Sequence, residues 1–346
     1  MTVLKFSFPL RLFLCVFLFL NSAVAVRADE ADNAAGAQAA EAAFIQRLVE
    51  KDGFSADQVR GWLDTAQVRD SILQTMSQPP ETRSWPDYRA GFMTEARIRA
   101  GVNFWQNNAG WLNLARCEYG VEPQYIVAIL GVETFYGRQT GRYPILDALV
   151  TLGFHFPPRQ QFFQDELEQF LLLAREEHMD PLAHKGSYAG AMGIPQFMPS
   201  SYRRWAVDLN RDGVRDIWGE PADAIGSVAN YFRSFGWQSG GGFLLPVTVQ
   251  PSDQLSALMQ QPFTERRHTL AEWGALGVDI GATTLPPDTP AWLFSLDDGE
   301  QQSWYLGLNN YFVLTRYNRS VYYATTVFQL AQALQQAVVP TVVSCN

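Results

Sequence analysis

The sequence predicts a mainly α-helical protein, α+β overall, with one small β-rich insertion. Apolar side chains recur at helical spacings of three and four residues from about 55 to 177, and again over 319–338. Between 240 and 310, glycines, prolines and short β-branched or aromatic runs replace this periodicity. The chain has 346 residues, of which 47% are hydrophobic, so a large core divided among two or three domains is expected.

The first 28 residues have the layout of a cleaved signal peptide. Lys5 and Arg11 precede an apolar run at 12–20, and small residues follow as far as Ala28. This run is too short for a membrane span, which needs roughly 20 apolar residues. We therefore expect an exported mature chain that begins near Val26 or Asp29 and has no stable membrane span.

Charge and cysteine content narrow the class of protein. The formal net charge is −9, and it becomes about −12 once the basic residues of the signal segment are removed. Because no basic block stands out, the sequence argues against nucleic acid as a partner. Cys117 and Cys345 remain after signal cleavage, and they could pair in an oxidising compartment or stay as free thiols.

A solvated tail followed by helices is predicted after the signal peptide. The stretch at 29–42 is rich in Ala, Asp and Glu and is expected to be a solvated tail before the first helix. Ser55 stands at the start of a capping box, which marks the beginning of a helix. Thr94 is a candidate cap for a long helix that is expected to end near Gly120.

The next predicted helix carries a carboxylate in its apolar stripe. Pro123 suits its first turn and Gly137 its end. Burial of a lone carboxylate raises its pKa, and an acid still protonated near neutral pH can protonate the leaving oxygen of a glycosidic bond. The alternative is a helix-end glutamate that reaches solvent or pairs with Arg138. The stripe consists of Ile126, Ile129, Leu130 and, at the i+7 position, Glu133.

A glycine-containing stretch at 186–202 follows a further predicted helix at 159–177. Its glycines lie among small and polar residues, which lets backbone approach a ligand and leaves amides free to donate hydrogen bonds. A polysaccharide offers hydroxyl and N-acetyl groups to such a surface. The alternative is a tight connection between helices, in which glycine only relieves crowding.

Residues 208–213 reproduce the first half of a calcium-binding loop. Oxygen-bearing side chains stand at positions 1, 3 and 5, and Gly213 stands at the turn. Because Gly219 replaces the usual acidic residue at position 12, Glu220 or Asp223 would have to complete the shell. The alternative is a surface turn with Asp223 as the N-cap of the next helix. The expected loop ligands are Asp208, Asn210, Asp212, the carbonyl of Val214 and, directly or through water, Asp216.

The final third mixes strand and helix signals. The runs at 247–249, 291–296 and 311–315 have the composition of strands. Helical periodicity then returns over 319–338, so the small β-rich unit interrupts a helical body.

Three motifs together resemble the membrane-bound lytic murein transglycosylase B family. They are Gly131-Val132-Glu133-Thr134, the stretch at 186–202 and the segment at 223–232, and the resemblance extends to 308–323. The family's catalytic core is similar to goose-type lysozyme. The resemblance implies a division into an N-terminal helical domain at 29–110, a lysozyme-like core with the calcium loop at 111–239, a β-rich domain at 240–310, and a return to the core at 311–346.

The resemblance also implies a reaction. Glu133 would act alone, first protonating the oxygen between N-acetylmuramic acid and N-acetylglucosamine in peptidoglycan. It would then accept the proton of the muramic acid C6 hydroxyl as that oxygen attacks C1, which gives a 1,6-anhydro sugar without water. The substrate's own N-acetyl group is expected to stabilise the cationic intermediate, unlike glycosidases with two carboxylates.

The family's binding residues map onto matching positions of this chain. Ser187 and Gln196 are expected to orient the N-acetyl group and the sugar, and Asp223 to complete a Ca²⁺ shell, with no organic cofactor. This chain has one more residue between Asp208 and Asp223 than the family pattern. For the tyrosines, the alternative is ordinary core packing. The residues expected to line the cleft are Tyr88, Tyr231, Tyr317, Asn318 and Tyr323.

The surroundings of Cys15 bear on the expected location of the protein. Cys15 follows Leu14 rather than a small residue and lies inside the apolar run, so no lipid attachment is predicted. We therefore expect a soluble periplasmic protein that acts on peptidoglycan glycan strands, with other cell-wall enzymes as candidate partners.

Two rival functions remain. A hydrolase would need a second carboxylate, and a non-catalytic peptidoglycan-binding protein would not need Glu133. The candidates for a second carboxylate are Asp147, Asp165 and Asp180.

Overall fold

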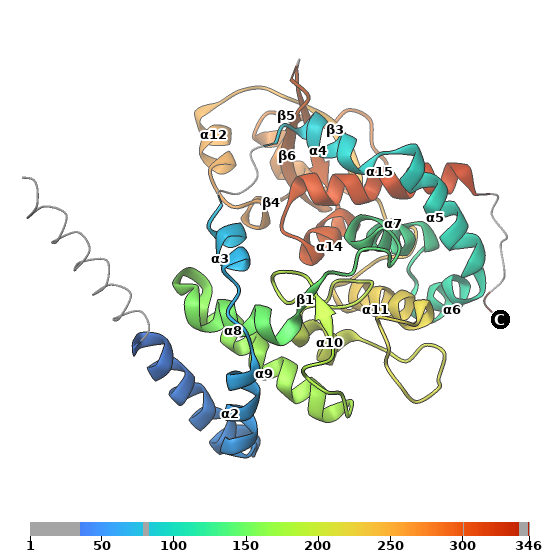
Figure 1. The fold of residues 1–346 in the computed structure, drawn as a ribbon. Helices are drawn as coiled ribbons and strands as arrows, with labels where there is room; N and C mark the ends of the chain where they lie inside the picture. The colour runs from blue at the N-terminus through green and yellow to red at the C-terminus, as the bar shows by residue number, and fades with distance from the viewer. Residues whose placement is uncertain (1–34, 79–82, 300, 339–344, 346) are drawn as a thin grey trace, which may run out of the picture.

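The computed structural model describes residues 35–78, 83–299, 301–338 and 345 (Figure 1). Helices dominate these residues, and a small antiparallel sheet lies beside the helical body, as predicted. The predicted signal peptide lies outside the described residues. Within the described part of the chain, no helix combines the length and the apolar content that a membrane crossing requires.

The N-terminal segment is more ordered than its composition indicated. A helix covers 35–52, and Ala37, Phe44 and Leu48 are buried along one of its faces. The prediction of a solvated tail is therefore wrong over 35–42, because the alanine-rich stretch forms the first turns of an amphipathic helix. The helices that follow are α2 (Ala56–Thr65), α3 (Asp70–Ser77), α4 (Trp85–Phe92), α5 (Glu95–Asn107) and α6 (Ala109–Tyr119).

The long helix expected between Thr94 and Gly120 is broken at Asn108. Thr94 caps α5 by accepting a hydrogen bond from the amide of Arg97, and Gly120 ends α6 in the left-handed conformation. At Asn108 the side-chain amide donates to the carbonyl of Phe104 across 2.8 Å. Asparagine competes with the backbone in this way and thereby favours a break between two helices.

α7 (Pro123–Thr134) occupies the centre of the helical body (Figure 1). It packs against α5, α6, α11 and α15. Every residue from Tyr125 to Val132 is buried, so the expected apolar stripe is part of a helix that is covered all round. The remaining helices are α8 (Ile145–His155), η1 (Pro157–Arg159), α9 (Gln160–Glu176), α10 (Pro199–Trp205), α11 (Pro221–Ser234), α14 (Asn309–Tyr317) and α15 (Val321–Ala337).

The β-rich part forms a five-stranded antiparallel sheet in the order β4-β6-β7-β3-β5. It has its own apolar cluster, which includes Leu255, Trp273 and Leu306. Its elements are β3 (Leu244–Val249), α12 (Asp253–Met259), η2 (Phe263–Glu265), β4 (Arg267–Thr269), α13 (Leu270–Ala275), β5 (Val278–Asp279), β6 (Pro290–Asp297) and β7 (Gln302–Gly307). A separate two-stranded ladder pairs β1 (Tyr143–Pro144) with β2 (Lys185–Gly186).

The run at 311–315 is helical and not a strand. It lies within α14, where Tyr311, Val313 and Leu314 are buried. The ring of Tyr311 stacks on Phe294 of β6 at a centroid distance of 4.8 Å. Aromatic and β-branched residues favour strands only where the surrounding surface suits them, and here packing against the sheet and α15 favours a helix.

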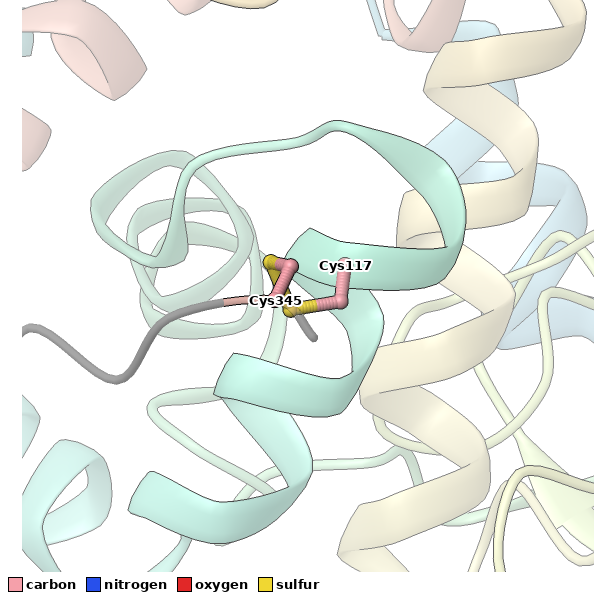
Figure 2. The surroundings of a disulfide bond; sticks show 2 residues. All are labelled: Cys117 and Cys345. Carbon is pink, nitrogen blue, oxygen red and sulfur yellow. A yellow bond between two sulfur atoms is a disulfide. The ribbon is translucent and has the colours of Figure 1, made fainter.

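Two links close the fold. The amide of Leu308 donates to the carbonyl of Phe243 across 2.8 Å, so the chain enters and leaves the β-rich part at one place. Cys117 of α6 forms a disulfide with Cys345, with a Cα to Cα distance of 5.4 Å (Figure 2). Of the two states considered for these cysteines, the structure contains the paired one.

Candidate active site

The C-terminal end of α7 has an unusual backbone. Phe135 and Tyr136 have positive φ angles of 51° and 61°, and Gly137, the expected end of the helix, has 86°. Consecutive non-glycine residues in this region are strained. The turn places the ring of Tyr136 against Gly131, where an added Cβ would come within 2.6 Å of the ring atoms. The helix therefore ends at Thr134, and Glu133 lies in its last turn.

Glu133 is partly buried, and it accepts a hydrogen bond from a tyrosine. The hydroxyl of Tyr323 in α15 donates to Oε1 of Glu133 across 2.5 Å. Burial raises the pKa of Glu133 to about 7, and the hydrogen bond from Tyr323 acts in the opposite direction. The alternative pairing with Arg138 is wrong, because its guanidinium lies over the ring of Phe135 at 5.2 Å.

Two further tyrosines lie beside this pair. Tyr317, at the end of α14, donates its hydroxyl to the carbonyl of Pro195 across 2.6 Å. Its ring lies 4.9 Å from that of Tyr231 in α11, whose hydroxyl donates to the carbonyl of Arg316. Burial and the charge of Glu133 raise the pKa values of Tyr317 and Tyr323 well above the ordinary value for tyrosine. Both hydroxyls therefore remain protonated donors at any physiological pH.

Tyr88 and Asn318 occupy different surroundings. Tyr88 is partly buried in an aromatic group with Trp85, Phe92 and Tyr322 on α4 and α15. Its neighbour Tyr322 precedes Tyr323 in α15. Asn318 follows the last residue of α14 and is exposed, next to Tyr317. The structure thus gathers the tyrosines around Glu133 and leaves Asn318 on the surface.

The glycine-containing stretch at 186–202 is tied together internally. Oγ of Ser187 accepts from the amides of Ala189 and Ala191 at 3.2 and 3.0 Å. Gln196 has a φ of 53°, and its side-chain amide donates to the carbonyls of Thr140 and Gly193. The expectation of free backbone amides is wrong for much of the stretch, because a buried loop must satisfy its own polar groups. The amides already engaged include those of residues 187, 190, 192, 194, 196 and 197.

Arg97 is a site neighbour that sequence reasoning missed. Its Nη1 donates to the carbonyl of Gly131 across 2.5 Å, at the negative end of the α7 dipole. The guanidinium lies between the rings of Phe92 and Phe135, at 5.0 and 4.9 Å. Burial lowers its pKa. An arginine three residues after a helix cap normally faces solvent, so the sequence offered no signal for this contact.

The loop at 208–219 is folded around its own oxygen-bearing side chains. Oδ2 of Asp208 accepts from the amide of Gly213 at 2.8 Å, and Oδ1 of Asp212 accepts from that of Val214 at 2.9 Å. Asn210 contributes an amide oxygen, which accepts from the amide of Asp212. Two carboxylates and an amide oxygen on alternate residues are donors that suit a hard cation. Across the ranges that the structure describes, no group of three or more acidic, histidine or cysteine side chains is gathered closely enough to hold a metal by itself.

Asp223 binds two backbone amides of this loop. It is fully buried in the first turn of α11, and its two oxygens accept from the amides of Leu209 and Asp216 at 2.9 and 2.8 Å. The alternative in which Asp223 is the N-cap is wrong, because Glu220 holds that position. Burial raises the pKa of Asp223, and the charge of Asp208 adds to the effect.

The carboxylates considered for a hydrolytic mechanism are engaged elsewhere. Asp147 is buried and binds Arg69, Asp165 forms an ion pair with Arg47 at 3.5 Å, and Asp180 accepts from the amide of Leu182. Each of the three therefore has a structural partner away from Glu133 and the tyrosines beside it.

Comparison with known proteins defines the class to which this fold and site belong. The helical core is lysozyme-like, and an acid beside aromatic side chains suits an enzyme that cleaves polysaccharides. A family model described as Transglycosylase SLT domain matches residues 36–332. The membrane-bound lytic murein transglycosylase B of Escherichia coli (strain K12) is 42% identical over 310 residues, which cover 85% of this chain and 82% of that protein. The chain therefore belongs to the transglycosylase SLT domain family and is a peptidoglycan lytic transglycosylase.

Solved structures agree with this assignment. The soluble lytic transglycosylase SltB1 of Pseudomonas aeruginosa is 43% identical with a TM-score of 0.79, covering 86% of this chain and 98% of that one. The Escherichia coli lytic transglycosylase Slt35 in complex with calcium is 41% identical with a TM-score of 0.77, covering 86% and 93%. SltB3 of Pseudomonas aeruginosa in complex with NAG-NAM-pentapeptide is 30% identical with a TM-score of 0.73, covering 87% and 80%.

Proposed function

We propose that this enzyme cleaves the β-1,4 bond between N-acetylmuramic acid and N-acetylglucosamine without water, with Glu133 as acid and then base. The observation that carries the proposal is the pairing of a partly buried Glu133, whose pKa is raised to about 7, with the hydroxyl of Tyr323. A carboxyl group with this pKa has both protonation states available near neutral pH, which an acid-then-base sequence requires.

The hydrogen bond assigns different roles to the two oxygens of Glu133. Because Tyr323 donates to Oε1, that oxygen is an acceptor, and Oε2 carries the transferable proton. The proton passes to the glycosidic oxygen as its bond to C1 of the muramic acid breaks. The carbonyl oxygen of the substrate's N-acetyl group closes on C1 and holds the positive charge in a cyclic cation.

The second step returns the enzyme to its starting state. Glu133, now a carboxylate, accepts the proton of the C6 hydroxyl while O6 forms a bond with C1 and the N-acetyl oxygen leaves. The products are a 1,6-anhydromuramic acid end and a free N-acetylglucosamine end, and Glu133 is again protonated. Tyr323 stabilises the carboxylate between the two steps, because its hydrogen bond favours the charged form.

The surrounding residues would hold the sugar. We assign Gln196 and Ser187, which lie on the glycine-containing stretch, to the N-acetyl group and the ring hydroxyls. Tyr317 and Tyr88, both partly buried, would offer aromatic faces for sugar rings, and Asn318 would offer an exposed amide. Tyr231 is buried, and it would support Tyr317 from behind. The substrate class is supported by SltB3, whose structure holds NAG-NAM-pentapeptide.

We infer that the loop at 208–219 binds Ca²⁺ as a structural ion. The ion would be held by Asp208, Asn210, Asp212 and the carbonyl of Val214, and Asp223 would complete the set of ligands. The donor chemistry supports this, as does the calcium complex of Slt35. Bound calcium would neutralise the loop carboxylates and cross-link the ends of the loop.

We also propose that the chain acts on glycan strands in the periplasm, as a mature protein starting near Asp29. The disulfide between Cys117 and Cys345 supports an oxidising compartment. The separate apolar cluster of the β-rich part supports a division of the chain near 240 and 310.

Product analysis tests the proposed reaction. Purified peptidoglycan is digested with the mature protein and, in parallel, with Glu133→Gln, and the fragments are identified by mass spectrometry. We expect anhydromuramic ends from the wild type and none from the variant. Reducing muramic acid ends would indicate a hydrolase, and the absence of any release by the wild type would favour a binding protein.

A further inference from the structure

Thr134 is the residue after Glu133, and its hydroxyl has three hydrogen-bond partners, one of which is the carbonyl of Leu130 in its own helix at 3.3 Å. It is fully buried, and Oγ1 donates to the carbonyl of Ile194 across 2.8 Å. The same oxygen accepts from the amide of Gly137 at 3.0 Å. One hydroxyl therefore caps the strained turn that ends α7 and binds the stretch that carries Ser187 and Gln196.

Ile194 and Pro195 are held from three directions. The amide of Ile194 donates to the carbonyl of Ile217, at the exit of the loop at 208–219, across 2.8 Å. Its carbonyl accepts from Thr134, and the carbonyl of Pro195 accepts from Tyr317. Two consecutive carbonyls are thus bound by hydroxyl groups from α7 and α14. Gln196, with its positive φ, follows immediately.

The contact of Thr134 with Ile194 directly connects the Glu133 end of α7 with this stretch. It lies closer to Glu133 than the other link between these segments, the hydrogen bond from the side chain of Gln196 to the carbonyl of Thr140. A reaction that needs proton transfer at one atom while another group holds the sugar depends strongly on such relative placement.

We propose that Thr134 is a positioning residue for the transglycosylase reaction, whose hydroxyl sets the distance between Glu133 and the sugar-binding stretch at 186–202. The inference rests on the proposed function. Thr134 does not touch the substrate, so its effect is on the chemical step more than on binding.

The test compares two substitutions at Thr134 with a matched control. Thr134→Val keeps the shape and removes the hydroxyl, and Thr134→Ser keeps the hydroxyl. Thr326→Val is the control, because Thr326 is also fully buried and its hydroxyl has no hydrogen-bond partner among the described residues. kcat and KM are measured from anhydromuramic product release, with melting curves for each variant.

We expect Thr134→Val to lower kcat at least tenfold with KM within threefold of wild type, and Thr134→Ser and Thr326→Val to stay within threefold in both. A Thr134→Val variant with wild-type kcat, or a Thr134→Ser variant as impaired as Thr134→Val, would overturn the inference. An active wild type with unaffected variants removes this inference alone, whereas a wild type without anhydromuramic products removes the proposed function.

A second measurement separates mispositioning from partial unfolding. Both Thr134 variants are combined with Glu133→Gln, and binding of an uncleaved glycan fragment is followed by calorimetry. We expect one site per molecule and an affinity within threefold of Glu133→Gln alone. A stoichiometry that falls in proportion to kcat would show that Thr134→Val only reduces the folded fraction, and would overturn the positioning role even if the melting curves were ambiguous.

Discussion

Tyr323 and Glu133 are 190 residues apart in the sequence and share a hydrogen bond of 2.5 Å. The bond joins the first turn of α15 to the last turn of α7, at a partly buried place in the helical body. Desolvation favours the neutral form of Glu133, and the hydrogen bond from Tyr323 partly offsets this effect. The chemistry of the site depends on the balance between these two influences.

Replacing Tyr323 with Phe should shift the pH dependence of the reaction upward. The hydrogen bond lowers the pKa of Glu133, so its loss should raise that pKa above about 7 and move the alkaline fall in kcat to higher pH. The less stable carboxylate should also lower kcat by roughly 10- to 150-fold, since a hydrogen bond to a charged group contributes about 1.5–3 kcal/mol. Tyr322→Phe is the control, and equal pH profiles for the two variants would contradict the expectation.

Glu133→Gln should abolish product release and stabilise the protein in a pH-dependent way. The pKa in the folded state, about 7, lies above the ordinary 4.5, so folding loses stability as the pH rises from below 4.5 through 7. The glutamine of this variant does not ionise, so the gain should approach about 3 kcal/mol at pH 8 and vanish near pH 4. Denaturant unfolding at both pH values measures it, and a gain independent of pH would argue against a raised pKa.

Calcium should raise the melting temperature of a chelator-treated sample. An ion that binds only the folded state adds about 2.7 kcal/mol at 100 times its Kd. Asp212→Asn should remove most of this shift, whereas Asp279→Asn, which alters a similar Asp turn in the β-rich part, should leave it unchanged. An unchanged melting temperature of the wild type on adding calcium would eliminate the proposed ion.

Gly131→Ala and Gly61→Ala should change stability in opposite directions. An added Cβ at Gly131 would meet the ring of Tyr136 at 2.6 Å, and nothing lies within 4 Å at Gly61. We expect a loss of about 1–3 kcal/mol at Gly131 and a gain of up to about 1 kcal/mol at Gly61 in α2. Chemical denaturation measures both, and losses of equal size would show that the contact with Tyr136 is not the cause.

Removing either half of the disulfide should lower stability to the same extent. Cys117→Ser, Cys345→Ser and the double variant should each lose about 2–5 kcal/mol, because one cross-link is lost in all three. Thermal unfolding under non-reducing conditions measures the loss. Additive losses in the double variant would mean that the two thiols act separately.

Local sequence patterns predicted most of the helices and the position of Glu133, but they could not predict contacts between distant segments. The Thr94 cap and Pro123 gave correct helix starts. The run at 311–315 was misjudged because its preference is decided by the sheet against which it packs. Asn108 could have signalled a break, since its amide competes for backbone carbonyls.

The candidate site shows the same limit. The gathering of Tyr231, Tyr317 and Tyr323 around Glu133 came from the family resemblance and not from spacing. Arg97 and Thr134 were missed because each acts through a backbone carbonyl at least 34 residues away, and no sequence period encodes such contacts. Thr134 carried one usable sign, a polar residue next to Glu133 at the end of a mostly apolar helix.

The hydrogen bond between Leu308 and Phe243 has a consequence for how this protein can be altered. Because the two backbones touch where the β-rich part begins and ends, the helical body needs only a short bridge at that point. A chain in which 244–307 is excised could be closed by a tight turn, but it would lose the ring of Phe294 that stacks on Tyr311 of α14, so a grafted module has to cover this face. The enzyme thus has a built-in insertion point, at which size and surface can diverge as long as the inserted module still packs on α14.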